Sequence, residues 1–264
     1  MRKIILIALT IVALGFSYAQ ERPSFIQSPC DNFTVDLHEN LYLWKDAVLE
    51  KRSTDGKVLA QYSNPALGTI RSVDASIPSK ILVFHQESGT LVLLDNTLSP
   101  AGNALSLFDH GLYSITLAAF AGTNRIALFD DAAQQLLLTD LDLNIVNSTP
   151  VDAGPDFHPT LIESSLDKNV LMADSLLGIL FFDKFGSFER KLPLTDVQSM
   201  QMQGNNLYYL KDDNLYNYDL LALDIILVSN GLSDIRAFRR TNSNLYLLDK
   251  EGILTHRPAS RTRR

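Results

Sequence analysis

The chain has 264 residues, of which 46% are hydrophobic and 20% charged, and its formal net charge at pH 7 is −7. This composition is that of a folded globular protein and excludes wholesale disorder. With the two basic residues of segment 1–19 and the four arginines of segment 257–264 set aside, the charge of the remainder falls to −13. Such an acidic body repels a phosphate backbone, so nucleic acid is not an expected partner.

Residues 1–19 have the pattern of a secretory signal peptide. Arg2 and Lys3 form a charged start, residues 4–16 are apolar, and Ser17-Tyr18-Ala19 offers a small-x-small cleavage site. A retained membrane anchor is the alternative, but the apolar run is shorter than the roughly 20 residues that span a bilayer. We therefore expect export to the periplasm or an outer-membrane-associated location, with no transmembrane segment in the mature chain.

The chain contains one cysteine, Cys30. A single cysteine cannot form an internal disulfide, so the fold must depend on its hydrophobic core. The preceding residues, Gln-Ser-Pro, do not form the small-residue box of a bacterial lipoprotein, so lipidation is not expected. A buried structural thiol is the favoured expectation, and an intermolecular disulfide is the alternative.

A five-residue phrase recurs six times, at intervals of 37 to 45 residues. The copies are NLYLW (40–44), KILVF (80–84), RIALF (125–129), NVLMA (169–173), NLYYL (206–210) and NLYLL (244–248). A period near forty, built from strand-like phrases without helical stretches between them, is typical of propeller blades. The sequence therefore predicts one all-β domain over residues 20–256, a six-bladed propeller of four-stranded antiparallel blades.

Each repeat contains short runs with period-2 apolar alternation, bounded by turn residues. The second run is almost continuously apolar, as expected for a strand buried on both faces. The sixth repeat has only three runs, which would leave an unpaired sheet edge. We expect Ser24 to Ser28 to supply the missing strand and close the ring, and residues 257–264 to form a disordered basic tail.

The third run of four repeats ends in an aspartate. These residues are Asp95, Asp140, Asp183 and Asp219. Aspartate at the start of a turn accepts hydrogen bonds from the amides that follow. A catalytic acid has no reason to occur once per blade, so we expect a structural role.

The repeated N-L-Y-L phrase and the apolar-apolar-Asp ending of the third run resemble six-bladed propellers of the TolB-like and NHL-like kind. The chain is similar in particular to small exported propellers of Gram-negative envelopes. This resemblance covers about residues 24–256 and implies an architecture, because one fold hosts many functions.

Two histidines lie in segments that connect one predicted blade to the next. His110 and His158, with Asp156 and neighbouring acids, could hold zinc or another divalent ion. No close His-x-His spacing supports this, and solvated loop residues are the favoured interpretation. We therefore expect no bound metal and no cofactor.

The starts of the inner strands carry Arg71 and Arg236. Resemblance to lactonase- and lyase-type propellers would imply a metal held there by acids and amides, which two arginines disfavour. The guanidinium groups could instead hold a carboxylate or phosphate. The favoured alternative is that they pair with loop acids, of which Asp74, Asp196 and Asp234 are the candidates.

The sequence contains no nucleophile elbow and no phosphate-binding loop. We therefore expect a non-catalytic protein-binding or scaffold propeller of the cell envelope, whose partner is another envelope protein, such as part of an outer-membrane complex. Leu112, Tyr113 and Phe157, on connecting loops, are the candidate contact residues. An enzyme, or a binder of a small ligand or metal at the channel mouth, is the alternative, and a sugar-binding module is a third possibility. Aromatic residues of the second runs are expected in the core.

Overall fold

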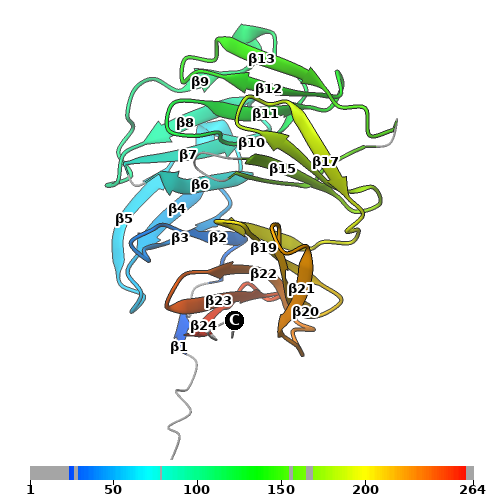
Figure 1. Cartoon of the computed structure of the whole chain (residues 1–264). Helices are drawn as coiled ribbons and strands as arrows, with labels where there is room; N and C mark the ends of the chain where they lie inside the picture. Colours follow the sequence, from blue (N-terminus) through cyan, green and yellow to red (C-terminus); the bar gives the residue numbers. More distant parts are fainter. Residues whose placement is uncertain (1–23, 27–28, 78, 155–156, 165–168, 260–264) are drawn as a thin grey trace, which may run out of the picture.

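The computed structural model describes residues 24–26, 29–77, 79–154, 157–164 and 169–259. They form six four-stranded antiparallel sheets arranged as the blades of a propeller (Figure 1). The described helices are two short 3₁₀ turns, Pro65–Leu67 and Phe108–His110. The predicted six-bladed all-β architecture is therefore confirmed.

The strands of each blade follow the order of the repeats. Blade 1 contains β2 (Asn32–Val35), β3 (Leu41–Lys45), β4 (Val48–Arg52) and β5 (Val58–Ser63). Blade 2 contains β6 (Ser72–Ile77), β7 (Lys80–His85), β8 (Thr90–Leu94) and β9 (Leu105–Ser106). Blade 3 contains β10 (Ile115–Phe120), β11 (Ile126–Asp130), β12 (Gln135–Thr139) and β13 (Ile145–Pro150). Blade 4 contains β14 (Leu161–Ser164), β15 (Asn169–Asp174), β16 (Gly178–Asp183) and β17 (Phe188–Leu192). Blade 5 contains β18 (Ser199–Gln203), β19 (Asn206–Lys211), β20 (Asn214–Asp219) and β21 (Asp224–Ser229). Blade 6 contains β22 (Ile235–Arg240), β23 (Asn244–Asp249), β24 (Leu254–Pro258) and β1 (Ser24–Ile26).

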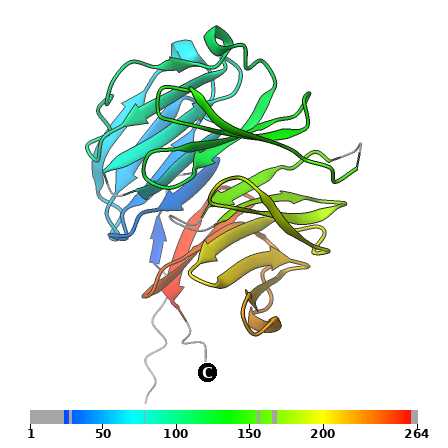
Figure 2. The same cartoon turned by 45° about the horizontal axis from the view of Figure 1, so that its top comes forward.

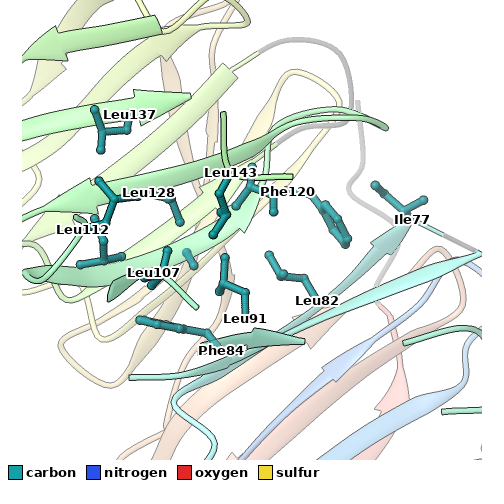
Figure 3. Packing of buried hydrophobic residues seen from close by; sticks show 13 residues of the cluster. Ile77, Leu82, Phe84, Leu91, Leu107, Leu112, Phe120, Leu128, Leu137 and Leu143 are labelled. Atoms are coloured by element: carbon teal, nitrogen blue, oxygen red, sulfur yellow. The ribbon is translucent and has the colours of Figure 1, made fainter. Parts of the chain in front are cut away.

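The hydrophobic core lies between neighbouring blades and is built mainly from the second and third strands. In β7 every residue after Lys80 is buried, as predicted for a strand covered on both faces. One cluster joins blades 2 and 3 through residues such as Phe84 and Leu128 (Figure 3). The aromatic residues of the second strands are buried as expected. They are Tyr42, Trp44, Tyr208, Tyr209 and Tyr246.

Blades 1 and 6 meet, so the first and last parts of the chain lie together (Figure 2). Cys30 donates its amide to the Gly252 carbonyl at 3.0 Å, and its buried side chain packs in the cluster between these blades. Beyond the other end of β2, the Glu39 carboxylate accepts hydrogen bonds from Thr241 Oγ1 at 2.8 Å and Asn244 Nδ2 at 2.9 Å. These contacts join the two ends of the ring through residues that follow β1.

Blade 6 takes its outer strand from the N-terminal side of the chain. β1 pairs antiparallel with β24, with Ser24 opposite His256 and Ile26 opposite Leu254 (Figure 1). The expected segment Ser24–Ser28 also includes residues 27–28, which lie outside the described residues.

The free cysteine is buried, as predicted for a structural thiol. Burial raises the pKa of Cys30 to about 11, although Arg236 opposes this shift. The thiol therefore stays protonated at neutral pH and is a poor nucleophile, because the thiolate is the reactive form.

The C-terminal boundary differs from the predicted one. Strand β24 continues through Arg257 and Pro258, which were expected in the tail. Arg257 donates to Ser229 Oγ at 2.6 Å, and its backbone pairs with Leu245. Ala259 donates its amide to the Ser243 carbonyl at 2.8 Å, and residues 260–264 lie outside the described part. Neighbouring strand pairing thus overrides the low apolar content of this segment.

None of the described helices is long and apolar enough to cross a bilayer. The predicted signal peptide, residues 1–19, lies outside the described residues.

Candidate functional site

The six inner strands enclose a central cavity of about 620 Å³. These strands are β2, β6, β10, β14, β18 and β22, each in contact with the next around the ring. Among the described residues, the charged ones that line the cavity are Arg71, Asp74, Glu163, Arg236 and Arg239. Three cations and two carboxylates give this lining a charge of +1, opposite in sign to the chain as a whole.

An ion pair crosses the cavity between blades 6 and 4. Arg239 Nη2 lies 2.9 Å from Glu163 Oε1, and the two side chains are 21% and 20% exposed. Arg239 Nη1 also donates to the Met200 carbonyl of blade 5 at 3.2 Å. This residue therefore joins three blades around the channel. We call Arg239 and Glu163 the channel pair.

The environment of Glu163 favours its neutral form. Desolvation raises its pKa to about 7, with the nearby Asp74 acting in the same direction and Arg239 opposing both. A carboxyl group removed from water loses hydration that one partner does not fully replace. Glu163 thus exchanges its proton near neutral pH.

Asp74 has a structural role in the channel. Its Oδ1 accepts from the Ser76 amide at 2.8 Å, and its Oδ2 accepts from the Phe120 amide of blade 3 at 2.8 Å. Inner strands have one edge without a strand partner, so their amides need other acceptors. The Asp74 carboxylate provides one, and both its oxygens are engaged.

Arg71 and Arg236 lie at the start of the inner strands, as predicted, but do not form the expected loop ion pairs. Arg236 donates from Nε to the Asp249 carbonyl at 3.0 Å and from Nη2 to the Cys30 carbonyl at 2.9 Å. The Arg71 side chain is exposed and has no hydrogen bond or ion pair in the described part of the chain. Neither arginine pairs with Asp74, Asp196 or Asp234. Arg236 donates to backbone carbonyls instead, and Arg71 is an exposed residue of the cavity lining.

The two histidines singled out in the sequence are exposed; His110 ends the 3₁₀ turn Phe108–His110, and His158 lies on a loop. The His110 ring bonds through Nδ1 to the Ser106 carbonyl at 2.9 Å. The His158 ring lies 2.8 Å from Asp131 Oδ1. Asp156 lies outside the described residues, and among those described no three His, Cys, Asp or Glu side chains are grouped as metal ligands. Each ring has a local partner that fixes its orientation.

The three candidate contact residues differ in exposure. Leu112 and Phe157 are buried, Phe157 against Phe129 with ring centroids 5.7 Å apart. Tyr113 is 72% exposed and stacks on Phe108 at 5.8 Å. Leu112 and Phe157 therefore belong to the core between blades, and Tyr113 alone offers a surface.

A second feature lies on the outside of blade 5, where a group of large apolar side chains is exposed. We call this group the edge patch; it consists of Leu221, Leu223, Ile225, Ile226 and Leu227. Its exposed fractions run from 39% at Ile226 to 76% at Leu221. Three of its members lie in β21, the outermost strand of the blade, which is hydrogen-bonded on one side only.

The pairing of β21 differs from that of other outer strands. β5 and β13 also expose apolar residues, Val58–Leu59 and Ile145–Val146, but these lie at a β-bulge near the strand start. In β21 the bulge falls at Val228, near the strand end. The apolar residues Ile225 to Leu227 therefore lie on a regular stretch of ladder. Bulges protect sheet edges from further pairing, and this stretch lacks that protection.

Carboxylates lie at the start of this exposed edge. Asp219 ends β20, and Asp224 begins β21 directly opposite it. Asp219 accepts hydrogen bonds from the amides of Leu221 and Ala222, which lower the pKa of its carboxyl group. The edge is therefore apolar along its length and negatively charged at one end.

No family model matches the sequence, and no curated protein matches it. Many solved structures share the fold. A streptogramin B lyase aligns with a TM-score of 0.61 at 10% identity, covering 86% of this chain and 78% of the lyase chain. BamB from Moraxella catarrhalis aligns with a TM-score of 0.54 at 11% identity, covering 89% and 99%. BBS1N, solved in complex with ARL6DN, aligns with a TM-score of 0.54 at 16% identity, covering 89% and 78%. At such identities the likeness concerns the fold alone.

The channel pair and the edge patch were not among the residues singled out in the sequence. A signal existed for each. Glu163 and Arg239 are charged residues in the middle of the predicted inner strands. The run DIILVS of β21 is apolar where the fourth strand of blade 4, FERKL, is charged.

Proposed function

We propose that this protein is a non-catalytic docking propeller of the bacterial cell envelope, which binds an extended segment of another envelope protein along β21. The observation that carries this proposal is the edge patch on a regular, one-sided stretch of ladder. Unpaired sheet edges add a further strand through main-chain hydrogen bonds, while alternate side chains provide specificity.

The side chains define the chemistry of the partner segment. Ile225 and Leu227 project from one face of the strand and Ile226 from the other, so both faces of an added strand would meet apolar side chains. The partner should therefore carry large apolar residues in alternation. A lysine or arginine should lie where the segment passes Asp219 and Asp224, because opposite charges stabilise this end.

The location and the class of partner have separate support. The N-terminal pattern of residues 1–19 favours export, which places the partner in the envelope. The structural neighbour BBS1N was solved with another protein bound, so a propeller of this kind can serve protein docking. The streptogramin B lyase aligns with a similar TM-score. In the alternative function, a small ligand would bind in the central channel.

The test is affinity capture of the tagged mature protein from the envelope fraction of its native cells, followed by cross-linking and mass spectrometry. An Ile225→Thr/Leu227→Thr variant should capture at least tenfold less partner than the wild type. The matched control is Ile145→Thr/Val146→Thr, which removes similarly exposed residues from the bulged edge of β13 and should leave capture unchanged.

The cross-links decide where and what the protein binds. They should join β21 to an extended apolar segment that carries a basic residue near Asp224. Equal capture by both variants, or cross-links confined to other blades, would contradict the proposal.

A further inference from the structure

The central channel has a feature that docking at blade 5 does not use. Polar side chains from four consecutive blades line one mouth of the cavity: Gln198 of blade 5, Arg236 of blade 6, Asn32 of blade 1 and Arg71, just before β6 of blade 2. We call these four residues the rim. All four side chains can donate hydrogen bonds.

The rim arginines keep free donors. Arg236 is held by two backbone carbonyls through Nε and Nη2, which leaves Nη1 unbonded in the described structure. The Arg71 guanidinium has no partner among the described residues. Asn32 Oδ1 accepts the Phe33 amide at 2.9 Å, so its amide nitrogen remains as a donor.

The carboxylates of the cavity do not neutralise the rim. Both oxygens of Asp74 accept backbone amides, and Glu163 is paired with Arg239, three residues beyond Arg236 along β22. Two guanidinium groups therefore line one cavity without an ion-pair partner among the described residues. Because opposite charges attract, an anion within reach of both groups gains favourable interactions with both.

We propose that the rim is a binding site for a small oxyanion, with the Arg71 guanidinium as a forked donor and Arg236 Nη1 as a further donor to a carboxylate or phosphate group. Arginine presents planar pairs of N–H groups that match both of these groups. The lining charge of +1 disfavours a divalent cation at the same place. This site is independent of the edge patch, so either can be correct without the other.

The chain provides its own reporter for this site. Trp44 is the only tryptophan, is almost fully buried, lines the same cavity and lies opposite Asn32 in the pairing of β2 with β3. A ligand at the rim should change the tryptophan fluorescence. Binding can therefore be followed in the unlabelled full protein.

The experiment is a fluorescence titration at constant ionic strength with inorganic phosphate and, separately, with citrate, checked by isothermal titration calorimetry. Saturable binding of either anion to the wild type is expected. Arg71→Gln should weaken it at least tenfold. Because the Arg71 side chain is exposed and makes no hydrogen bond or ion pair among the described residues, this variant should fold normally. Lys57→Gln, which removes one exposed positive charge from a blade 1 turn, should bind like the wild type.

Each result has a defined meaning. Binding of citrate alone identifies a carboxylate ligand, and binding of phosphate alone identifies a phosphoryl ligand; both support the proposal if Arg71→Gln weakens them. No saturable binding of either anion, or equal affinity of the wild type and Arg71→Gln, would overturn it.

Discussion

Aspartates that end the third strands bind the turn that follows them, one per blade in blades 2 to 5. In blade 4, Asp183 Oδ1 accepts from the amides of Phe185 and Ser187, both at 2.8 Å. Asp95, Asp140 and Asp219 make equivalent contacts. The structural role predicted from the sequence is confirmed. It was predictable because an aspartate reaches amides two to four residues ahead, so the interaction depends on local sequence alone.

Replacing one such aspartate should destabilise the protein without disturbing the other blades. Asp183→Ala removes the acceptor for two amides and should lower the free energy of unfolding by about 1–2 kcal/mol. Asp183→Asn keeps Oδ1 as an acceptor and should lose less than half of that amount. Urea denaturation of the three proteins measures the difference, and a wild-type stability for Asp183→Ala would contradict the assigned role.

Glu163 could not be assigned from the sequence, because its partner Arg239 lies in a different blade. Its folded-state pKa of about 7 is above the unfolded value of about 4.5. Between these values the folded state binds more protons than the unfolded state, so stability falls as pH rises. The contribution of Glu163 to the free energy of unfolding is fully present below pH 4.5 and is lost above pH 7.

Glu163→Gln should therefore reduce the loss of stability between pH 5 and pH 8. The wild type should lose on the order of 2–3 kcal/mol through this group over that window. Glu251→Gln, at an exposed turn position, is the matched control and should keep the wild-type profile. Urea denaturation at several pH values measures the slopes, and an unchanged slope in Glu163→Gln would show that the group does not titrate there.

At the scale of elements, the period of the sequence and the apolar second strands were sufficient to predict the blades. The expectation of an N-terminal strand in blade 6 rested on counting strands, since the sixth repeat has only three. The structure pairs β1 with β24 over three residues. Contacts of Cys30 and Glu39 with blade 6 also join the ends, and these long-range bonds have no local sequence signal.

Deleting Glu21 to Ser28 should lower the melting temperature by roughly 10 °C, since it removes the outer strand of blade 6 and exposes the edge of β24. The deletion leaves Cys30 and Glu39 in place, so it isolates the contribution of β1. Removal of residues 261–264 serves as the control and should have little effect. Differential scanning calorimetry measures the difference. A deletion variant that melts at the wild-type temperature would contradict the expectation that Ser24 to Ser28 close the ring.

The outer strands illustrate where sequence reasoning stops. β5, β13 and β21 all contain exposed apolar residues, so hydropathy does not separate them. The position of the bulge does, because it interrupts the ladder at Leu59 and Val146 but leaves Ile225 to Leu227 in regular pairing. Bulge positions depend on the register between two strands, which the sequence of one strand does not fix.

For the whole molecule, the propeller separates two surfaces that could bind different partners. The edge patch lies on the outside of blade 5, whereas the rim and the channel pair line the axis. The fold was predictable from repetition, but a repeated scaffold carries no statement of activity. Both candidate sites come instead from departures from the repeat: a regular apolar stretch in the fourth strand of blade 5 and charges inside the inner strands.

The most direct measurement of the docking function is site-specific photo-cross-linking in intact cells. A photoreactive residue replaces Ile226 of β21 in one variant. In another it replaces Ser148 of β13, whose exposed apolar residues lie at a β-bulge. The account predicts one dominant adduct from position 226, with an extended apolar segment that carries a nearby lysine or arginine, and none from position 148. No adduct at 226, or the same adducts at both positions, would contradict the assignment of β21 as the docking edge.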